Sequence, residues 1–128
     1  MSRSIITTPA APAAIGTYSQ AVRAGNTLYV SGQIPLSPET MDLVSDNFDA
    51  QAERVFMNLA AICEAAGVSL NDTVKFTVYL TDLGNFSRVN AVMEQVLSAP
   101  YPARAAVEVS ALPKGAQIEI DAIVLIPE

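Results

Sequence analysis

The chain has 128 residues, of which 51% are hydrophobic, and it carries a formal net charge of -6, one cysteine and no histidine. This length suits one domain, residues 1–128. The hydrophobic fraction suggests more apolar surface than one small monomer would bury, which weakly indicates an oligomer. A single cysteine excludes an intrachain disulfide, and the lack of histidine argues against common metal sites and Ser–His or Cys–His nucleophiles. The acidic balance and scattered basic residues argue against electrostatic binding of nucleic acid.

No segment approaches the roughly 20 apolar residues that a membrane-spanning helix needs. The beginning of the chain offers only Ile5–Ile6 as an apolar run before Pro9, which is too short for a signal peptide. Together with a free thiol, this predicts a cytoplasmic protein without a membrane or nucleic-acid partner.

The first third of the chain predicts a connection, a hairpin and a loop. The stretch "TTPAAPAAIG" is rich in proline and alanine and is typical of an extended connection. Gly25–Asn26 is a turn pair between two short strands, and the second strand, Thr27–Gln33, alternates apolar and polar residues. "PLSPETMDLVSD" carries two prolines and predicts a loop or a small hairpin.

Two helices are predicted. Asn47 or Asp46 can cap the first, "NFDAQAERVFMNLAAICEAAG", and Gly67 ends it. Its apolar stripe includes Cys63, which is therefore expected to be an inert core residue. The second helix, "LGNFSRVNAVMEQVLS", has its own apolar stripe and ends before Pro100 and Pro102.

Three later segments alternate like strands: "TVKFTVYL", "PYPARAAVEVS" and "AQIEIDAIVLI". The first places Val74 and three other apolar residues on one face. In the second, Ala105, Val107 and Val109 make up the expected core face, opposite Arg104, Ala106 and Glu108. The complete order of strands and helices predicts an α+β fold whose two helices cover one sheet face. Another subunit is expected to cover the second face, which carries Tyr29, Tyr79, Ile123 and Leu125.

Arg104 and Glu119 are the first candidates for chemistry. We expect them on adjacent strands, both projecting from the free sheet face. The planar fork of an arginine suits a carboxylate, and a glutamate can orient or deprotonate water. From the pattern alone, a cross-strand ion pair or two solvated side chains is the favoured interpretation. A structural ion pair is also the expectation for Glu108.

Four further positions have both a functional and an ordinary interpretation. Gly32, after Ser31, permits close approach of a ligand to the backbone, or marks a bulge. Tyr18 can line a pocket or be merely half-buried. Asn90, beside the second helix stripe, can bond to a loop backbone.

The segments "APAAIGTYSQAV", "LYVSGQIPLSPET", "GVSLNDTVKFTVYLTDLGNFSRVN" and "YPARAAVEVSALPKGAQIEIDAI" together resemble the RidA/YjgF family of reactive intermediate (enamine/imine) deaminases. The resemblance runs from about Ile5 to Ile126. It implies a chorismate-mutase-like fold, in which a mixed six-stranded sheet carries two helices on one face. It also implies a homotrimer with a barrel-like centre and a site in each of three clefts between neighbours.

The resemblance also implies roles for individual residues. Arg104 would bind the substrate carboxylate, and Glu119 would position the attacking water. The substrate-binding positions would be Tyr18, Ser31, Gly32, Ala106, Phe86, Asn90 and Pro113. The implied reaction converts 2-imino or 2-enamino acids, such as 2-iminopropanoate and 2-iminobutanoate, to 2-oxo acids and ammonia, without metal or cofactor.

Two departures and three alternatives accompany this resemblance. Ala106 stands where many family members have a cysteine, and segment 91–103 is a few residues shorter than usual. One alternative is a non-catalytic trimer that binds 2-oxo acids as a regulator. Another is a hydrolase of a larger enamine acid, which the short segment leaves open. The third is an endoribonuclease, against which the acidic charge and the missing histidine argue.

Overall fold

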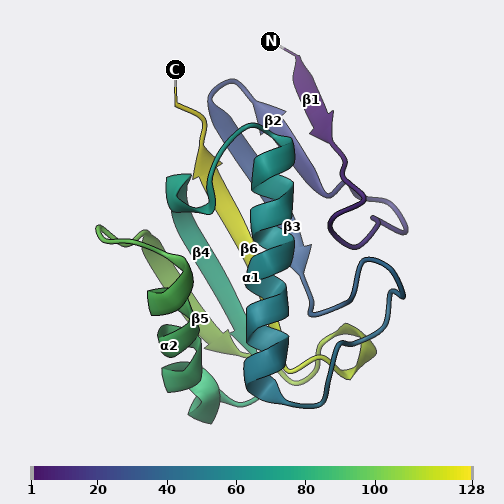
Figure 1. Ribbon diagram of the computed structural model, residues 1–128, viewed down its shortest axis with the longest axis vertical. Helices are drawn as coiled ribbons and strands as arrows, with labels where there is room; N and C mark the ends of the chain where they lie inside the picture. The colour runs from purple at the N-terminus through teal and green to yellow at the C-terminus, as the bar shows by residue number, and fades with distance from the viewer. Residues whose placement is uncertain (1, 128) are drawn as a thin grey trace.

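The computed structural model describes residues 2–127 and has two layers, a six-stranded sheet and two helices that lie on one of its faces (Figure 1). The strands are β1 Arg3–Ile6, β2 Ala21–Ala24, β3 Thr27–Gln33, β4 Thr73–Leu80, β5 Ala103–Glu108 and β6 Ile118–Leu125, and the helices are α1 Phe48–Ala65 and α2 Phe86–Val96. The strand order is β1-β2-β3-β6-β4-β5, with only β4 and β5 parallel. The predicted α+β class is confirmed.

The first three strands form an antiparallel meander. Gly25 adopts the left-handed backbone (φ 62°) that the predicted turn between β2 and β3 requires. Strand β1 was not predicted, because its few residues are exposed or half-buried and show no alternation. The loop after β3 is pinched by a bridge between Leu36 and Leu43, which confirms the small hairpin expected there.

Helix α1 supplies the main cover of the sheet. Asn47 caps it by accepting a hydrogen bond from the backbone N–H of Ala50 (3.0 Å), and Gly67 follows its end in the left-handed region (φ 79°). Its apolar stripe is buried, and Phe56 meets Phe76 of β4 edge to face, with ring centroids 5.8 Å apart. Cys63 is fully buried, and burial raises its pKa to about 11, which confirms it as an inert core residue.

Strand β4 departs from the predicted pattern at its start. A register shift between Thr73 and Lys75 buries Thr73 and leaves Val74 half exposed, so Val74 does not join the core face. Helix α2 then crosses from β4 to the parallel β5, as Figure 1 shows. In α2, Val92 is buried, whereas Val96 near the end of the helix is 38% exposed.

The two faces of β5 are the reverse of those predicted. Arg104 pairs in register with Phe76, which faces α1, and Arg104, Ala106 and Glu108 therefore lie on the helix side of the sheet. Val107 lies on the open face beside Tyr79. Alternation separates the two faces of a strand, but it does not say which of them the helices cover.

The other sheet face carries no helix in the part of the chain that the structure describes. As predicted, this face carries Tyr29 and Leu125, which are about half exposed, and Tyr79 and Ile123, which are half-buried. No helix in residues 2–127 combines the length and apolar character needed to cross a membrane.

Candidate active site

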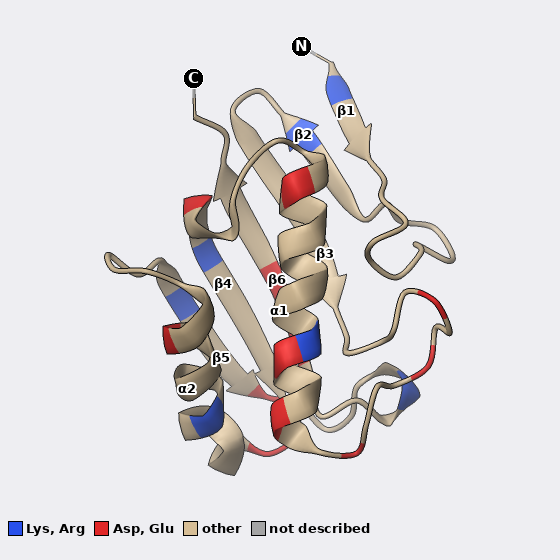
Figure 2. Ribbon diagram, viewed as in Figure 1, with Lys and Arg blue, Asp and Glu red and all other residues tan. Residues whose placement is uncertain are grey.

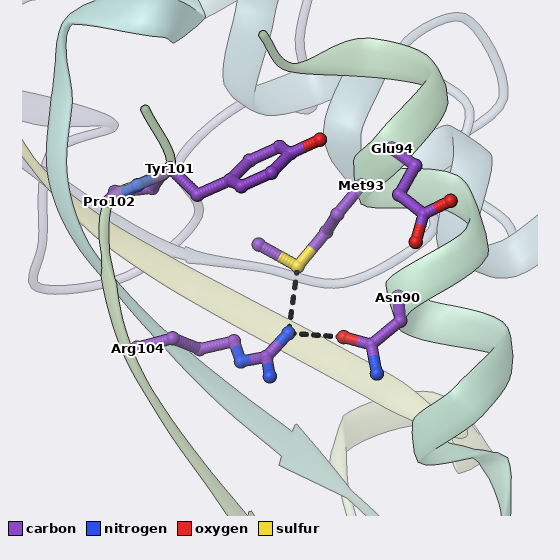
Figure 3. A pocket seen from close by; sticks show the side chains of 6 residues that line it. All are labelled: Asn90, Met93, Glu94, Tyr101, Pro102 and Arg104. Carbon is purple, nitrogen blue, oxygen red and sulfur yellow. Dashed lines mark hydrogen bonds between the residues drawn. The ribbon is translucent and has the colours of Figure 1, made fainter. Parts of the chain in front are cut away.

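Arg104 extends from β5 toward α2 and is held there by three side chains (Figure 3). Its Nη1 donates hydrogen bonds to Oδ1 of Asn90 and to the sulfur of Met93 (3.5 Å). The guanidinium carbon lies 4.5 Å from the ring centroid of Phe86, a cation–π geometry. Asn90 thus bonds to Arg104 and not to a loop backbone as predicted.

One edge of the Arg104 guanidinium remains available. No hydrogen bond from Nε or Nη2 occurs within residues 2–127, and the side chain is exposed. These two nitrogens form the fork that binds a carboxylate through two parallel hydrogen bonds. The guanidinium is therefore fixed on one side and open on the other.

Cavities lie on both sides of Arg104. One of about 410 Å³ is lined by Arg104, Asn90, Met93, Glu94, Tyr101 and Pro102, as Figure 3 shows. The other, of about 430 Å³, is lined by Leu83, Phe86, Arg104 and Ala106. The small side chain of Ala106 keeps the second cavity open beside the arginine.

Glu108 shares this side of β5 and organises the start of α2. Its Oε1 accepts a hydrogen bond from the backbone N–H of Leu83 (3.0 Å), at the beginning of the 3-10 turn Leu83–Asn85 that leads into α2. The expectation of a structural ion pair was wrong. This bond ties the end of β5 to the turn that precedes Phe86.

The Glu119 side chain, on β6, occupies the space next to Gly32 that a side chain at position 32 would fill. A Cβ atom on Gly32 would lie 2.1 Å from Oε2 of Glu119 and 2.9 Å from its Cδ, far inside van der Waals contact. Gly32 sits at a bulge, where Ser31 and Gly32 lie between the register pairs Val30–Ala122 and Gln33–Ile120. The bulge interpretation of Gly32 is therefore confirmed, and the side chain that lies against Gly32 is the Glu119 carboxylate. Approach of a ligand to this backbone stays a prediction.

Burial raises the pKa of the Glu119 carboxyl, and the nearby charge of Asp121 raises it further. Asp121 accepts a hydrogen bond from the Tyr79 hydroxyl (3.1 Å). A carboxylate with a raised pKa is a stronger base than one in open water. The environment of Glu119 thus suits proton transfer.

A cavity of about 310 Å³ opens beside Gly32 and is lined in part by Tyr18 and Pro113. Tyr18 is about half exposed, as a pocket wall with a free hydroxyl would be. The Ser31 hydroxyl donates to the backbone carbonyl of Ser19, so this serine fastens the bulge to the residue next to Tyr18. Tyr18, Gly32 and Pro113 therefore meet at one cavity. Glu119 lies next to Gly32, and Ser31 is hydrogen-bonded to the residue after Tyr18.

Several residues that shape the surroundings of these cavities were not predicted. Buried Gln20 holds the Pro/Ala-rich segment by donating to the carbonyls of Thr8, Ala11 and Pro12 and accepting from the Thr8 N–H. Met93, Tyr101, Met41 and Lys114 also line cavities, a role that was not predicted for them. Hydrophobic periodicity predicts which residues are buried and not which residues line a cavity.

Arg104 and Glu119 do not meet within one chain. Strand β4 lies between their strands, so they are not on adjacent strands as predicted. They also occupy opposite faces, because Arg104 is in register with core-facing Phe76, whereas Glu119 is in register with Tyr79 of the open face. The predicted site residues thus form two half-sites. The arginine half-site holds Phe86, Asn90, Arg104 and Ala106, and the glutamate half-site holds Tyr18, Ser31, Gly32, Pro113 and Glu119.

Comparison with known proteins adds a family to this geometry. The family model described as Endoribonuclease L-PSP matches residues 8–126. The RutC family protein y4sK of Sinorhizobium fredii is 53% identical over 119 residues, which cover 93% of this chain and 94% of that protein. A human 2-iminobutanoate/2-iminopropanoate deaminase is 44% identical over 123 residues, which cover 96% of this chain and 90% of that one.

The crystal structure of RidA from an Antarctic Psychrobacter species matches with a TM-score of 0.93 and 61% identity, covering 96% of this chain and 99% of that chain. The chain belongs to the RidA/YjgF family. The family resemblance seen in the sequence motifs is confirmed, as is the RidA/YjgF fold of one mixed sheet and two helices.

RidA/YjgF membership places this chain among relatives with different printed names, including deaminase and RutC proteins. The residues of the two half-sites are therefore the guide to its own chemistry. The structure offers an open arginine fork and a basic carboxylate, and residues 2–127 contain no cluster of three or more metal-ligating side chains.

Proposed function

We propose that the protein hydrolyses 2-imino acids, and their 2-enamino tautomers, to 2-oxo acids and ammonia. The observation that carries this proposal is the way Arg104 is held. Phe86, Asn90 and Met93 fix one side of its guanidinium, and the other edge is open to the carboxylate that every 2-imino acid carries. The deaminase names of the human relative and of two other mammalian proteins support the same reaction class.

Glu119 is the base in this proposal. As the oxygen of a bound water attacks the C=N carbon of the protonated imine, the carboxylate accepts one of the water protons, which gives a carbinolamine. Glu119 then passes this proton to the nitrogen. As the C–N bond breaks and ammonia leaves, the carboxylate accepts the hydroxyl proton, so the carbon becomes a carbonyl. Each turnover consumes one water and needs neither an oxidant nor a reductant. Such imines hydrolyse readily, so orientation and one base suffice.

The complete site is formed between neighbouring copies of the chain. The arginine half-site and the glutamate half-site lie on opposite faces of one sheet, so a single chain cannot bring both to one substrate. The open sheet face is partly apolar, with Tyr29 and Leu125 half exposed, and suits association with another copy. A homotrimer with one site between each pair of neighbours accounts for both observations.

The reaction is tested by generating imino acids in place with an amino acid oxidase and trapping them with semicarbazide. The protein is expected to reduce semicarbazone formation. Arg104→Ala should lower kcat/KM about 100-fold or more, because the carboxylate loses a charged, two-point partner. Glu119→Gln should lower kcat about 100- to 10,000-fold. Arg88→Ala, on the exposed surface of α2, is the matched control and should change neither.

Results of that assay can also reject the proposal. A wild-type protein that leaves semicarbazone formation unchanged, yet binds 2-oxo acids at Arg104, would be a regulatory binder and not an enzyme. Wild-type activity in Arg104→Ala would remove the arginine from the mechanism. Ribonuclease activity is named in the description of the family model, but the chain lacks a clustered basic surface for an RNA backbone, because the Lys and Arg residues are dispersed over separate elements (Figure 2).

Sharing of the site between chains has its own test. Arg104→Ala and Glu119→Gln chains are unfolded, mixed and refolded together. In randomly mixed assemblies, about a quarter of the sites combine an intact Arg104 with an intact Glu119, so activity should return to a comparable fraction. If activity does not return in mixtures that light scattering shows to be trimers, the shared site is disproved. Monomers at micromolar concentration would disprove the trimer.

A further inference from the structure

The cavity beside Gly32 has a wall that the proposed reaction does not yet use. Its volume is about 310 Å³, and beyond Gly32 and Pro113 it is lined by the apolar residues Ile34, Leu36 and Met41. None of these three residues has a role in holding the carboxylate or the water. Because Gly32 also contacts the Glu119 carboxylate, the cavity begins where the reacting carbon would be held.

Two residues of this wall have an unfavourable backbone conformation. Met41 (φ 63°) and Lys114 (φ 59°) both occupy the left-handed region, which side chains with a Cβ rarely adopt. They are joined, because the Lys114 ammonium donates a hydrogen bond to the carbonyl of Met41 (2.8 Å). Strained non-glycine residues persist where the surroundings hold them, and they cluster at ligand-binding sites.

The surroundings of Met41 are firmly fixed. The Met41 N–H donates to the carbonyl of Ser37 (2.8 Å), inside the small hairpin. The buried Asn58 amide of α1 also donates hydrogen bonds to the backbone carbonyls of Ile34 (3.3 Å) and Leu36 (3.1 Å). The wall is therefore preformed and does not have to be ordered when a ligand enters.

We infer that this cavity receives the side chain of the imino acid and that Met41 determines which side chains are preferred. The inference rests on the proposed function and names a residue for its specificity. With the C=N carbon beside Glu119, a substituent on that carbon can enter the cavity past Gly32. The apolar lining favours unbranched apolar side chains, and Lys114 is the cationic residue at the rim, its ammonium already bonded to Met41.

The experiment measures kcat/KM in the semicarbazide assay for imino acids made from alanine, 2-aminobutyrate, norvaline, norleucine and glutamate. Values should rise with the length of the apolar side chain. In Met41→Ala, the ratio of norleucine-derived to alanine-derived kcat/KM should fall about tenfold, because the longer chain loses its contact. Met57→Ala removes a methionine that is 56% exposed on α1, away from the cavity, and should leave the ratio unchanged.

Met41→Gly separates the side chain from the backbone. Glycine tolerates the left-handed conformation, so this variant removes the methionine and the strain together. The same fall in the ratio as in Met41→Ala is expected, because both variants lack the side chain.

Several results would overturn the inference while leaving the deaminase intact. These are equal kcat/KM for all side chains, a preference for the glutamate-derived imino acid, or an unchanged ratio in Met41→Ala. A ratio that changes in Met41→Gly alone would assign the effect to the backbone and would also overturn it. No turnover of any imino acid would reject the proposed function itself, and this inference with it.

Discussion

The two half-sites are built in different ways. In the arginine half-site, side chains do the positioning: Phe86 and Asn90 hold a long, exposed Arg104 from a neighbouring helix. In the glutamate half-site, the backbone does it: a bulge at Gly32 leaves a gap that the half-buried Glu119 fills. The long, flexible side chain of Arg104 thus depends on contacts with other side chains. The shorter Glu119 side chain, on a central strand, depends on the room that the missing Cβ of Gly32 provides.

This contrast sets different tolerances to substitution. Partners of Arg104 can be removed one at a time, and each loss weakens its orientation by a modest amount. Position 32 does not tolerate even the smallest side chain in this way, because a single carbon atom added to Gly32 overlaps the Glu119 carboxylate. We therefore expect the largest effects in the glutamate half-site.

Gly32→Ala should cause a large loss that approaches that of Glu119→Gln, lowering kcat about 100-fold or more by displacing the Glu119 carboxylate from its position. Circular dichroism should show a retained fold, since the clash is with a side chain that can move. The decisive control is the double variant Gly32→Ala/Glu119→Gln. If the alanine acts through Glu119, the double variant should be no slower than Glu119→Gln alone. Strictly additive losses would contradict this.

Asn90→Ala should have a smaller effect, raising KM about 5- to 10-fold with little change in kcat. The amide positions Arg104 but does not touch the reacting carbon, so carboxylate binding suffers more than chemistry. Asn71, which accepts a hydrogen bond from the Ser98 N–H, provides a control as Asn71→Ala. An equal loss of kcat in Asn90→Ala would mean that Asn90 takes part in catalysis itself.

Asp121→Asn should shift the pH profile more than the maximal rate. The charge of Asp121 contributes to the raised pKa of Glu119, and the reaction needs Glu119 deprotonated, so activity rises as pH increases through that pKa. Removing the charge lowers the pKa, and the acid limb of kcat/KM should move to lower pH. An asparagine can still accept the Tyr79 hydrogen bond. A shift to higher pH would contradict this assignment.

Glu108→Ala should have the smallest effect, a loss of about 0.5–1 kcal/mol in the free energy of unfolding, because it removes one exposed hydrogen bond to the Leu83 N–H. Urea unfolding would measure it. Glu108→Gln, which keeps an acceptor, should restore most of the loss. An unchanged midpoint in the alanine variant would show that this bond does not help to fix the start of α2.

The sequence predicted the elements better than their arrangement. Local signals located α1 from Asn47 to Gly67 and the turn at Gly25–Asn26, because caps and turns depend on neighbours in the chain. The position of β6 between β3 and β4 has no local signal, so the expectation that Arg104 and Glu119 lie on adjacent strands was wrong. Arrangement is decided by which apolar surfaces pack together, and these lie far apart in the sequence.

The same limit applies to the candidate site. The motifs identified Arg104 and Glu119 through the family resemblance, but not the separation of their half-sites within one chain. The bulge at Gly32 is one of the two interpretations that the sequence offers, but the packing of Glu119 against this glycine has no sequence signal. Met41 carried no signal, because an adverse backbone angle at a methionine cannot be inferred from its neighbours.

The central place of β6 has a consequence for how the protein is made. Strands β1–β3 and strands β4–β5 pair among themselves, but the two groups are joined in the sheet only through β6, the last of the strands in the chain. A ribosome must therefore release residues up to Leu125 before the sheet can close. Until then, the edges of β3 and β4 that pair with β6 in the complete sheet have no partner strand. Unpaired strand edges in a nascent chain favour aggregation and binding by chaperones.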